Sequence, residues 1–194
     1  MLLGSCGFHV GASTSASDAS DATDPVDAIG GQEAGDAPVD TAACPAGYGL
    51  TLAATTTRYR VITTTAVFRV QLVACAADAP GATHLASLET AEEIVGLRDA
   101  LVAAAATAGP GPFFIGAAQM PGGIGTGGWF VFTGGALPGG LWAPGQPSEN
   151  TGSSEQIANL ASDLLHDATG GTASEAVCEC DGRPVDPVVI GYVP

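Results

Sequence analysis

The chain has 194 residues, of which 46% are apolar and only 6% aromatic, enough for one domain of ordinary size plus an appendage. Its net charge is −15, from 20 acidic residues against 5 basic ones, and every basic residue is an arginine. This balance argues against nucleic-acid binding, because no basic stripe exists to neutralise phosphates. No run of about 20 apolar residues is present, so the sequence predicts no complete membrane-spanning helix.

The first six residues, MLLGSC, end in a possible modification site. Leu3-Gly4-Ser5-Cys6 resembles a bacterial lipobox, in which a small residue precedes the cysteine that becomes lipid-modified. The charged and apolar regions of a signal peptide do not precede it. We therefore interpret residues 1–6 as a truncated signal peptide with Cys6 as the lipidation site. The alternative is an accidental cysteine near the N-terminus.

Residues 7–43 consist mostly of Ala, Ser, Thr, Gly and Asp and contain no Lys or Arg. Such a segment cannot bury enough apolar surface to offset its conformational entropy, so we expect a disordered acidic linker. Like charges would keep the linker extended. After a lipidated Cys6 it would hold a globular domain, residues 44–194, away from a membrane surface.

The first half of that domain predicts a strand and at least one helix. Residues 59–65, YRVITTT, are β-branched and predict a strand. The apolar pattern of residues 66–81 fits either a strand or a helix. Thr90 and Glu93 form a capping box that starts a helix, which Gly109-Pro110 ends. The expected apolar face of this helix consists of Ile94, Leu97, Leu101 and Val102.

The second half predicts short strands separated by long loops. Residues 112–119 indicate a buried strand, residues 129–135 another, and residues 175–182 a closing strand. The Gly-rich run at 121–128 has no strand-loop-helix context, so it is not a phosphate-binding loop. Residues 157–171 have partial helical spacing but also fit a loop with a short strand. The predicted fold class is α+β.

The five cysteines are Cys6, Cys44, Cys75, Cys178 and Cys180. An odd number in an exported protein requires an explanation. If Cys6 carries lipid, four remain and two disulfides can form. A metal site at Cys178-x-Cys180 is the rival interpretation, although no other close pair of Cys or His supports it.

Several motifs follow one another in a fixed order along the domain. They are CPAGY at 44–48, HLASLETAEE at 84–93, FIGA at 114–117, Trp129, Trp142 followed by APGQP, LHD at 165–167 and VCE at 177–179. This series resembles the C-type lectin-like domain. The resemblance implies two helices, small antiparallel sheets and a long ligand loop, held by disulfides Cys75–Cys178 and Cys44–Cys180. In the chain-entropy model the first bridge, which closes about 100 residues, contributes roughly 4–5 kcal/mol.

The sequence also departs from the family pattern. The family's second disulfide is missing at both of its expected positions, near Ile157 and Gly170. Ser148 stands where the family has an Asn or Asp in the proline loop, directly after Pro147. His166 stands where the family has an Asn directly before Asp167.

The family's ligand loop corresponds to the region 142–167, where the resemblance implies a calcium ion between the loop and the following strand. Calcium takes six to eight oxygen ligands. A cis peptide before Pro147 would direct the side chains of Gln146 and Ser148 to the same side. Gln146, Glu155 and Asp167 retain suitable oxygens and are the expected metal ligands. The expected carbohydrate-binding residues are Gln146, Ser148, Glu155 and Asp167, with Glu149 and Asn150 as substitutes in the same loop.

These observations predict an exported, lipid-anchored binding module of the cell envelope that recognises a carbohydrate or a protein partner, with calcium assistance. It contacts the membrane only through its lipid. The alternative is a structural or adhesion protein with a degenerate calcium site. No enzyme is predicted, since the neighbouring residues His166 and Asp167 are the only catalytic candidates and adjacent residues rarely make a working pair. Trp129 and Trp142 are expected in the core, and His84 is expected to be structural.

Overall fold

The computed structural model describes residues 44–53, 55–104, 111–148 and 155–193. The predicted lipidation site Cys6, the signal peptide at 1–6 and the linker at 7–43 lie outside the described residues. The described elements are, in chain order, β1 (Leu50–Thr51), β2 (Arg58–Ala66), α1 (Phe68–Asp78), β3 (Thr83–Leu85), α2 (Ala91–Ala104), β4 (Phe113–Gln119), β5 (Trp129–Val131), β6 (Ile157–Ala161), β7 (Leu164–Ala168), β8 (Ser174–Cys180) and α3 (Pro187–Gly191). None of these helices is long and apolar enough to cross a membrane.

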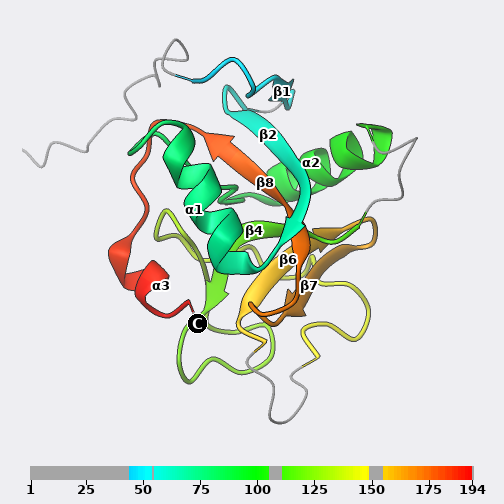
Figure 1. The fold of residues 1–194 in the computed structure, drawn as a ribbon. Coiled ribbons are helices and arrows are strands. Elements are labelled where there is room, and N and C mark those ends of the chain that lie inside the picture. Colours follow the sequence, from blue (N-terminus) through cyan, green and yellow to red (C-terminus); the bar gives the residue numbers. More distant parts are fainter. Residues whose placement is uncertain (1–43, 54, 105–110, 149–154, 194) are drawn as a thin grey trace, which may run out of the picture. The chain divides into compact units, whose positions relative to one another are not determined.

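The eight strands form one hydrogen-bonded sheet in the order β1-β2-β8-β4-β6-β7, with β3 added beside β8 and β5 beside β4 (Figure 1). All pairs are antiparallel except β4 and β8, which run parallel. The expected small antiparallel sheets are therefore joined through β4. The short helix α3, which begins at Pro187 after the capping side chain of Asp186, was not predicted.

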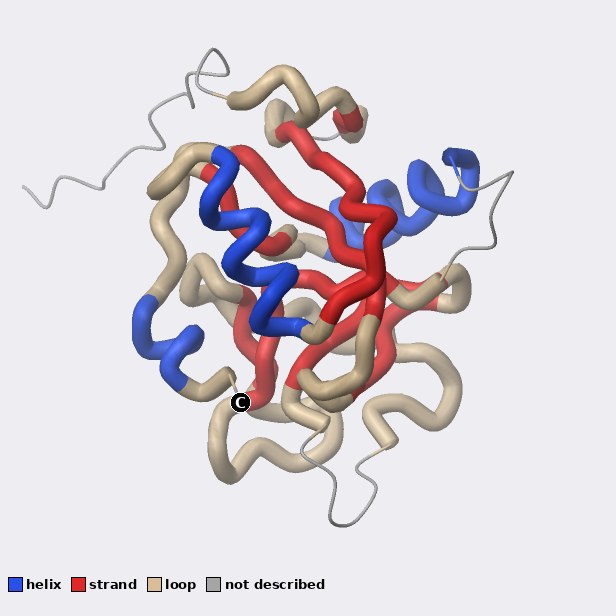
Figure 2. Tube along the Cα trace, in the orientation of Figure 1, coloured by secondary structure: helices blue, strands red, loops and turns tan. Residues whose placement is uncertain are grey.

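Alternate side chains of β4 enter two separate cores, one on each face of the sheet. Phe113, Ile115 and Ala117 join the cluster that contains α2, while Phe114 and Ala118 join the cluster that contains α1. Figure 2 shows strands running between these two helices. Because β4 is buried on both faces, its sequence is a continuous apolar run rather than an alternating one.

Helix α2 begins as its capping box predicts. The Thr90 side chain accepts a hydrogen bond from the Glu93 backbone N–H at 3.1 Å, and Glu93 reaches back to the backbone N–H of Glu89 at 2.9 Å. The prediction for Val102 is wrong, because its side chain is 43% exposed. Ile94, Leu97 and Leu101 share one stripe of the helix, and Val102 lies roughly 100° around the axis from the middle of that stripe. The predicted end at Gly109-Pro110 lies outside the described residues.

Residues 66–81, which the sequence left open, form helix α1. Its buried residues Phe68, Gln71 and Cys75 are spaced by three and four positions. Gln71 fills a polar position, since its Nε2 donates to the carbonyl oxygens of Thr64 at 2.7 Å and Ser174 at 2.8 Å. Gln71 thus links helix α1 to the C-terminal part of β2 and to the start of β8.

Two segments differ from their predictions. Residues 157–171 form the hairpin β6–β7 rather than a helix or one short strand, because Ser162-Asp163 makes a turn and Leu164 follows with a positive φ of 112°. The strand expected over 129–135 ends at Val131. Gly134, at φ 97°, closes a turn there through its N–H bond to the Val131 carbonyl.

Both predicted disulfides are present. Cys44–Cys180 and Cys75–Cys178 join residues with Cα atoms 5.8 and 5.3 Å apart. Cys178 and Cys180 lie on the same face of β8, as alternate residues of a strand do, and both belong to the core beneath α1. The rival metal site at Cys178-x-Cys180 is excluded because both sulfurs are bonded.

Candidate functional site

The predicted ligand loop is anchored to the edge strand β7. Trp142 forms a parallel bridge with Leu165. The Ala143 N–H donates to the Leu165 carbonyl at 2.9 Å, and the Leu165 N–H donates to the Leu141 carbonyl at 3.0 Å. The backbone of 141–143 therefore continues the sheet and fixes where the following loop begins.

A tight turn follows. The Gln146 N–H donates to the Ala143 carbonyl at 2.9 Å, and Gly145 adopts a φ of 83° that suits glycine. The Gln146–Pro147 peptide bond is cis, as predicted. This turn brings the loop back toward β7.

Four predicted site residues meet there. The Ser148 N–H donates to Oδ1 of Asp167 at 2.9 Å, and the Asp167 N–H donates to Oε1 of Gln146 at 3.3 Å. The Ser148 hydroxyl lies 3.2 Å from Oε2 of Glu155 and 3.4 Å from Oδ1 of Asp167. Residues separated by up to 21 positions thus place two carboxylates, one amide oxygen and one hydroxyl in a single group.

This group is an oxygen-rich acceptor surface. Ionised carboxylates only accept hydrogen bonds, and charge-assisted bonds to them are stronger than neutral ones. Hydroxyl-bearing ligands supply matching donors. The predicted substitutes Glu149 and Asn150 lie outside the described residues.

His166 faces a different partner. Its Nε2 lies 2.7 Å from Oδ1 of Asp163, and both side chains are partly exposed. The hydrogen bond to His166 lowers the pKa of the Asp163 carboxyl. His166 therefore bonds within the β6–β7 hairpin, and its own side chain does not supply the oxygen of the Asn that it replaces in the family pattern.

The two tryptophans, which were expected in the core, pack against each other. Their ring centroids lie 4.7 Å apart at a tilt of 56°, Trp129 is buried, and Trp142 packs against the same core. Nε1 of Trp129 donates to the Gly125 carbonyl at 3.0 Å. This pairing ties the Gly-rich loop to the base of the site.

No protein-family model matches the sequence, and no curated protein matches it. Solved structures do match. The C-type lectin CEL-I from Cucumaria echinata aligns with a TM-score of 0.57 and 16% identity, over 70% of this chain and 96% of that one. A mouse scavenger receptor C-type lectin carbohydrate-recognition domain aligns with a TM-score of 0.55 and 20% identity, over 71% and 98%. The fold is that of the C-type lectins.

A third structure with the C-type lectin fold is a calcium-independent type II antifreeze protein. It aligns with a TM-score of 0.53 and 18% identity, over 74% of this chain and 95% of that one. The resemblance noted in the motif series of the sequence is thus confirmed at the level of fold.

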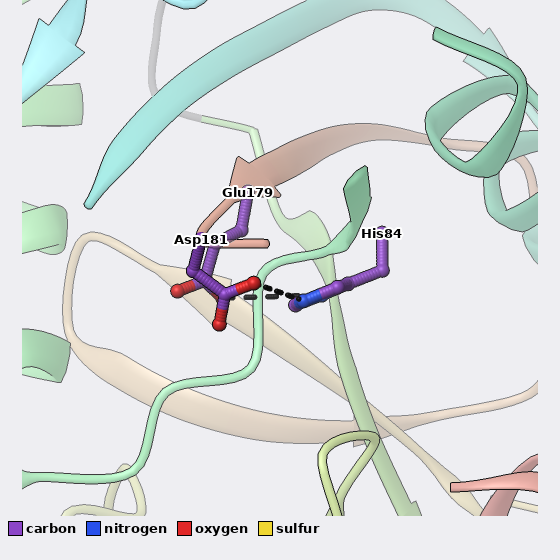
Figure 3. Close-up of side chains that lie close together, drawn as sticks. All are labelled: His84, Glu179 and Asp181. Atoms are coloured by element: carbon purple, nitrogen blue, oxygen red, sulfur yellow. Dashed lines mark hydrogen bonds and ion pairs between the residues drawn. The ribbon is translucent and has the colours of Figure 1, made fainter. Parts of the chain in front are cut away.

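The sequence did not predict a second polar cluster within this C-type lectin fold. His84 on β3 pairs with Glu179 on β8, and Asp181 follows β8. Figure 3 shows the three side chains close together, with Nε2 of His84 3.0 Å from Oδ1 of Asp181. All three are buried. His84 was expected to be structural, but its acidic partners were not expected, because the chain segments are about 95 residues apart.

Arg183 borders this cluster and connects it to Glu89, in the segment that precedes α2. Its guanidinium bonds Asp181 through Nε and both carboxylate oxygens of Glu89 through Nη1, at 2.7 and 2.8 Å. The bonds from His84 and Arg183 lower the pKa of Asp181 in spite of its burial. Glu179 behaves oppositely, since burial and the charges of Asp181 and Glu93 raise its pKa. The sequence signal that could have indicated this cluster is the segment VCECD at 177–181, in which every second residue is acidic from Glu179 on.

Proposed function

We propose that the domain is a binding module that takes a carbohydrate at the group formed by Gln146, Ser148, Glu155 and Asp167. The observation that carries this proposal is the convergence of four side-chain oxygens between the cis-proline loop and β7. Vicinal sugar hydroxyls can donate to the two carboxylates and accept from the serine hydroxyl. The C-type lectin neighbours, including a carbohydrate-recognition domain, support the ligand class. The proposal includes no catalytic step.

Calcium fits the four residues in part. Two carboxylates and an amide oxygen are the hard donors that Ca²⁺ prefers, so Gln146, Glu155 and Asp167 would hold it. A bound ion would draw sugar hydroxyls into its coordination shell. Ser148 adds only a neutral hydroxyl, and His166 is bonded to Asp163. We therefore propose calcium as an assisting ion, with the remaining ligands supplied by water or sugar hydroxyls.

Export and lipid anchoring complete the proposal. Two disulfides support an oxidising compartment, because such bonds are rare in reducing ones. Cys6 would carry the lipid, and the acidic 7–43 segment would serve as the tether. Release of the full-length protein from membranes by a Cys6→Ser substitution in its natural host would test this part.

A structural or adhesion protein of the cell envelope, recognising a protein partner, is the second candidate. Two observations favour it: the neutral hydroxyl at Ser148 and the engagement of His166 with Asp163. Neither Ser148 nor His166 therefore offers calcium the carboxylate or amide oxygen that the family pattern has at these positions. A calcium-independent protein among the structural neighbours has the same fold.

A glycan array probed with the full chain separates these candidates. We expect saturable binding to a subset of glycans, stronger in calcium than in chelator, and lost on Asp167→Ala. The matched control is Asp163→Ala, which removes an exposed carboxylate on the same hairpin and should leave binding unchanged. Binding to no glycan in either condition would refute the carbohydrate proposal and favour the protein-partner candidate. Equal glycan binding with calcium and with chelator would refute only the role of calcium.

A further inference from the structure

The buried cluster of His84, Glu179 and Asp181 lies on different elements from the loop site. His84 and Glu179 are direct partners in the β3–β8 ladder, and Glu179 and Asp181 point to the same face because they are two residues apart. Their exposed fractions are 1%, 0% and 2%. One ligand atom from each lies within 4.8 Å of those of the other two.

The imidazole of His84 is oriented as in a metal-binding histidine. Its Nδ1 lies 2.8 Å from the backbone carbonyl oxygen of Leu85, which can only accept, so Nδ1 carries a hydrogen. Nε2 then presents its lone pair toward Oδ1 of Asp181, 3.0 Å away. Two lone pairs facing each other require either a second proton on the ring or a cation between them. Donation from the other ring nitrogen to a carbonyl is the usual second contact of a metal-bound histidine.

The carboxylate of Glu179 supplies the independent observation. Its Oε2 accepts the backbone N–H of Ser87 at 2.6 Å. Its Oε1 is buried and has no hydrogen-bond partner among the described residues, and the same holds for the hydroxyl of Ser87. An isolated buried carboxylate oxygen is costly unless it is paired, protonated or bound to a metal.

No described arginine supplies the missing cation to Glu179. Arg183 bonds Asp181 and Glu89 instead. The nearest positive candidate is Nδ1 of His84, 4.0 Å from Oε2 of Glu179, and that nitrogen already faces Leu85. Arg183 thus compensates Asp181, and Glu179 is the carboxylate of the cluster to which no described arginine is bonded.

We propose that His84, Glu179 and Asp181 bind a divalent transition metal ion of the zinc class. One imidazole nitrogen and two carboxylate oxygens suit Zn²⁺, whereas an imidazole nitrogen is a poor ligand for Ca²⁺. Two ligands of a tetrahedral zinc ion lie roughly 3.3 Å apart, close to the 3.0 Å between Nε2 of His84 and Oδ1 of Asp181. The Ser87 hydroxyl or water would be the fourth ligand. The ion would fasten β3 to the end of β8.

The test uses the full chain with its disulfides formed and with Cys6→Ser, which removes the free thiol as a competing zinc ligand. Metal-free protein is titrated with Zn²⁺ by calorimetry, and with Co²⁺ by visible absorption, which reports nitrogen and oxygen ligation directly. We expect one equivalent of Zn²⁺ to bind and raise the melting temperature. His84→Gln should weaken zinc binding by at least about 100-fold.

Three further variants keep the outcome clear. Glu179→Gln keeps the acceptor for the Ser87 N–H while removing the charge, so it should fold, and it should also lose zinc affinity. His166→Gln breaks the exposed histidine–aspartate pair with Asp163 and should bind zinc normally. Asp167→Ala should do the same, which separates this site from the loop site.

The proposal is overturned if the Cys6→Ser protein binds no zinc equivalent. It is also overturned if Glu179→Gln or a folded His84→Gln binds zinc with unchanged affinity. In either case a second proton on His84, rather than a metal ion, accounts for its contact with Asp181.

Discussion

Replacing Gly116 with alanine should strongly destabilise the fold, because this residue lies where β4 crosses the end of β3, at Leu85 and Ala86. A Cβ atom there would lie 2.4 Å from the carbonyl oxygen of Leu85 and 3.2 Å from Cδ2 of Phe132. The Gly116 N–H also donates to the Ala86 carbonyl, and its carbonyl accepts from the Phe132 N–H, both at 2.8 Å. The nearest obstacle is backbone, so rotation of a side chain cannot relieve the clash.

The expected cost follows from this geometry. Overpacking of a core commonly costs about 1–3 kcal/mol, and a clash with hydrogen-bonded backbone lies at or above the upper end, so we expect about 3 kcal/mol or more. For a domain of this size that corresponds to a loss of roughly 6–12 °C in melting temperature. Urea unfolding with intact disulfides, followed by the fluorescence of Trp129 and Trp142, measures the change.

Gly49→Ala provides the matched control. A Cβ at Gly49 meets nothing within 4 Å, and this glycine does not have a positive φ. We expect its free energy of unfolding to stay within about 0.5 kcal/mol of the parent. If Gly116→Ala costs less than about 1 kcal/mol, the close crossing of β4 and the end of β3 is wrong.

Three further predictions concern stability. Tyr48 donates to Asp78 at 2.8 Å, and burial followed by this bond raises its pKa to about 12. Tyr48 loses its proton near pH 10 in the unfolded chain and near pH 12 in the folded chain, so its own contribution to stability should fall by about 2–3 kcal/mol across that interval. Burial also raises the pKa of Tyr59, which adds a fall of its own in both proteins. In pH-dependent urea unfolding, stability should therefore fall by about 2–3 kcal/mol less in Tyr48→Phe than in the parent, and parallel curves would contradict this. Gln71→Met removes the donor to the buried Ser174 carbonyl and to the more exposed Thr64 carbonyl, and it should cost about 1–3 kcal/mol in the same assay. A cost below about 0.5 kcal/mol would show that the two bonds contribute nothing. Replacing Cys75 and Cys178 together by alanine opens a loop that spans 103 positions, so the free energy of unfolding should fall by roughly 4–5 kcal/mol. Calorimetric or urea unfolding measures this, and a fall below about 1 kcal/mol would contradict the entropic explanation.

Local chemistry made some elements predictable from sequence. Thr90 and Glu93 mark the start of α2 because the Thr90 side chain accepts from the Glu93 N–H and the Glu93 side chain accepts from the Glu89 N–H, both within one turn. Helix α1 stayed ambiguous, since exposed Val70 and Val73 alternate with its buried positions and leave little amphipathic contrast. The β6–β7 hairpin was missed because Ile157, Leu160 and Leu164 have helix-like spacing.

The two polar groups differ in how far the sequence could reveal them. The order of the motifs that resemble the C-type lectin-like domain was sufficient to assign Gln146, Ser148 and Asp167 to one ligand-loop region from the sequence. The pairing of His84 with Glu179 depends on the β3–β8 register, which no local pattern of residues specifies. Residue spacing and composition therefore do not predict which side chains meet through such long-range strand pairing.

Amide chemical shifts can locate a carbohydrate bound between the cis-proline loop and β7. The ¹⁵N-labelled full chain is titrated with the glycan selected on the array. We expect the largest shifts at the N–H groups of Ser148 and Asp167, because they donate to Asp167 and Gln146 within the site. Saturable shifts centred on other residues, with these two amides unchanged, would contradict it.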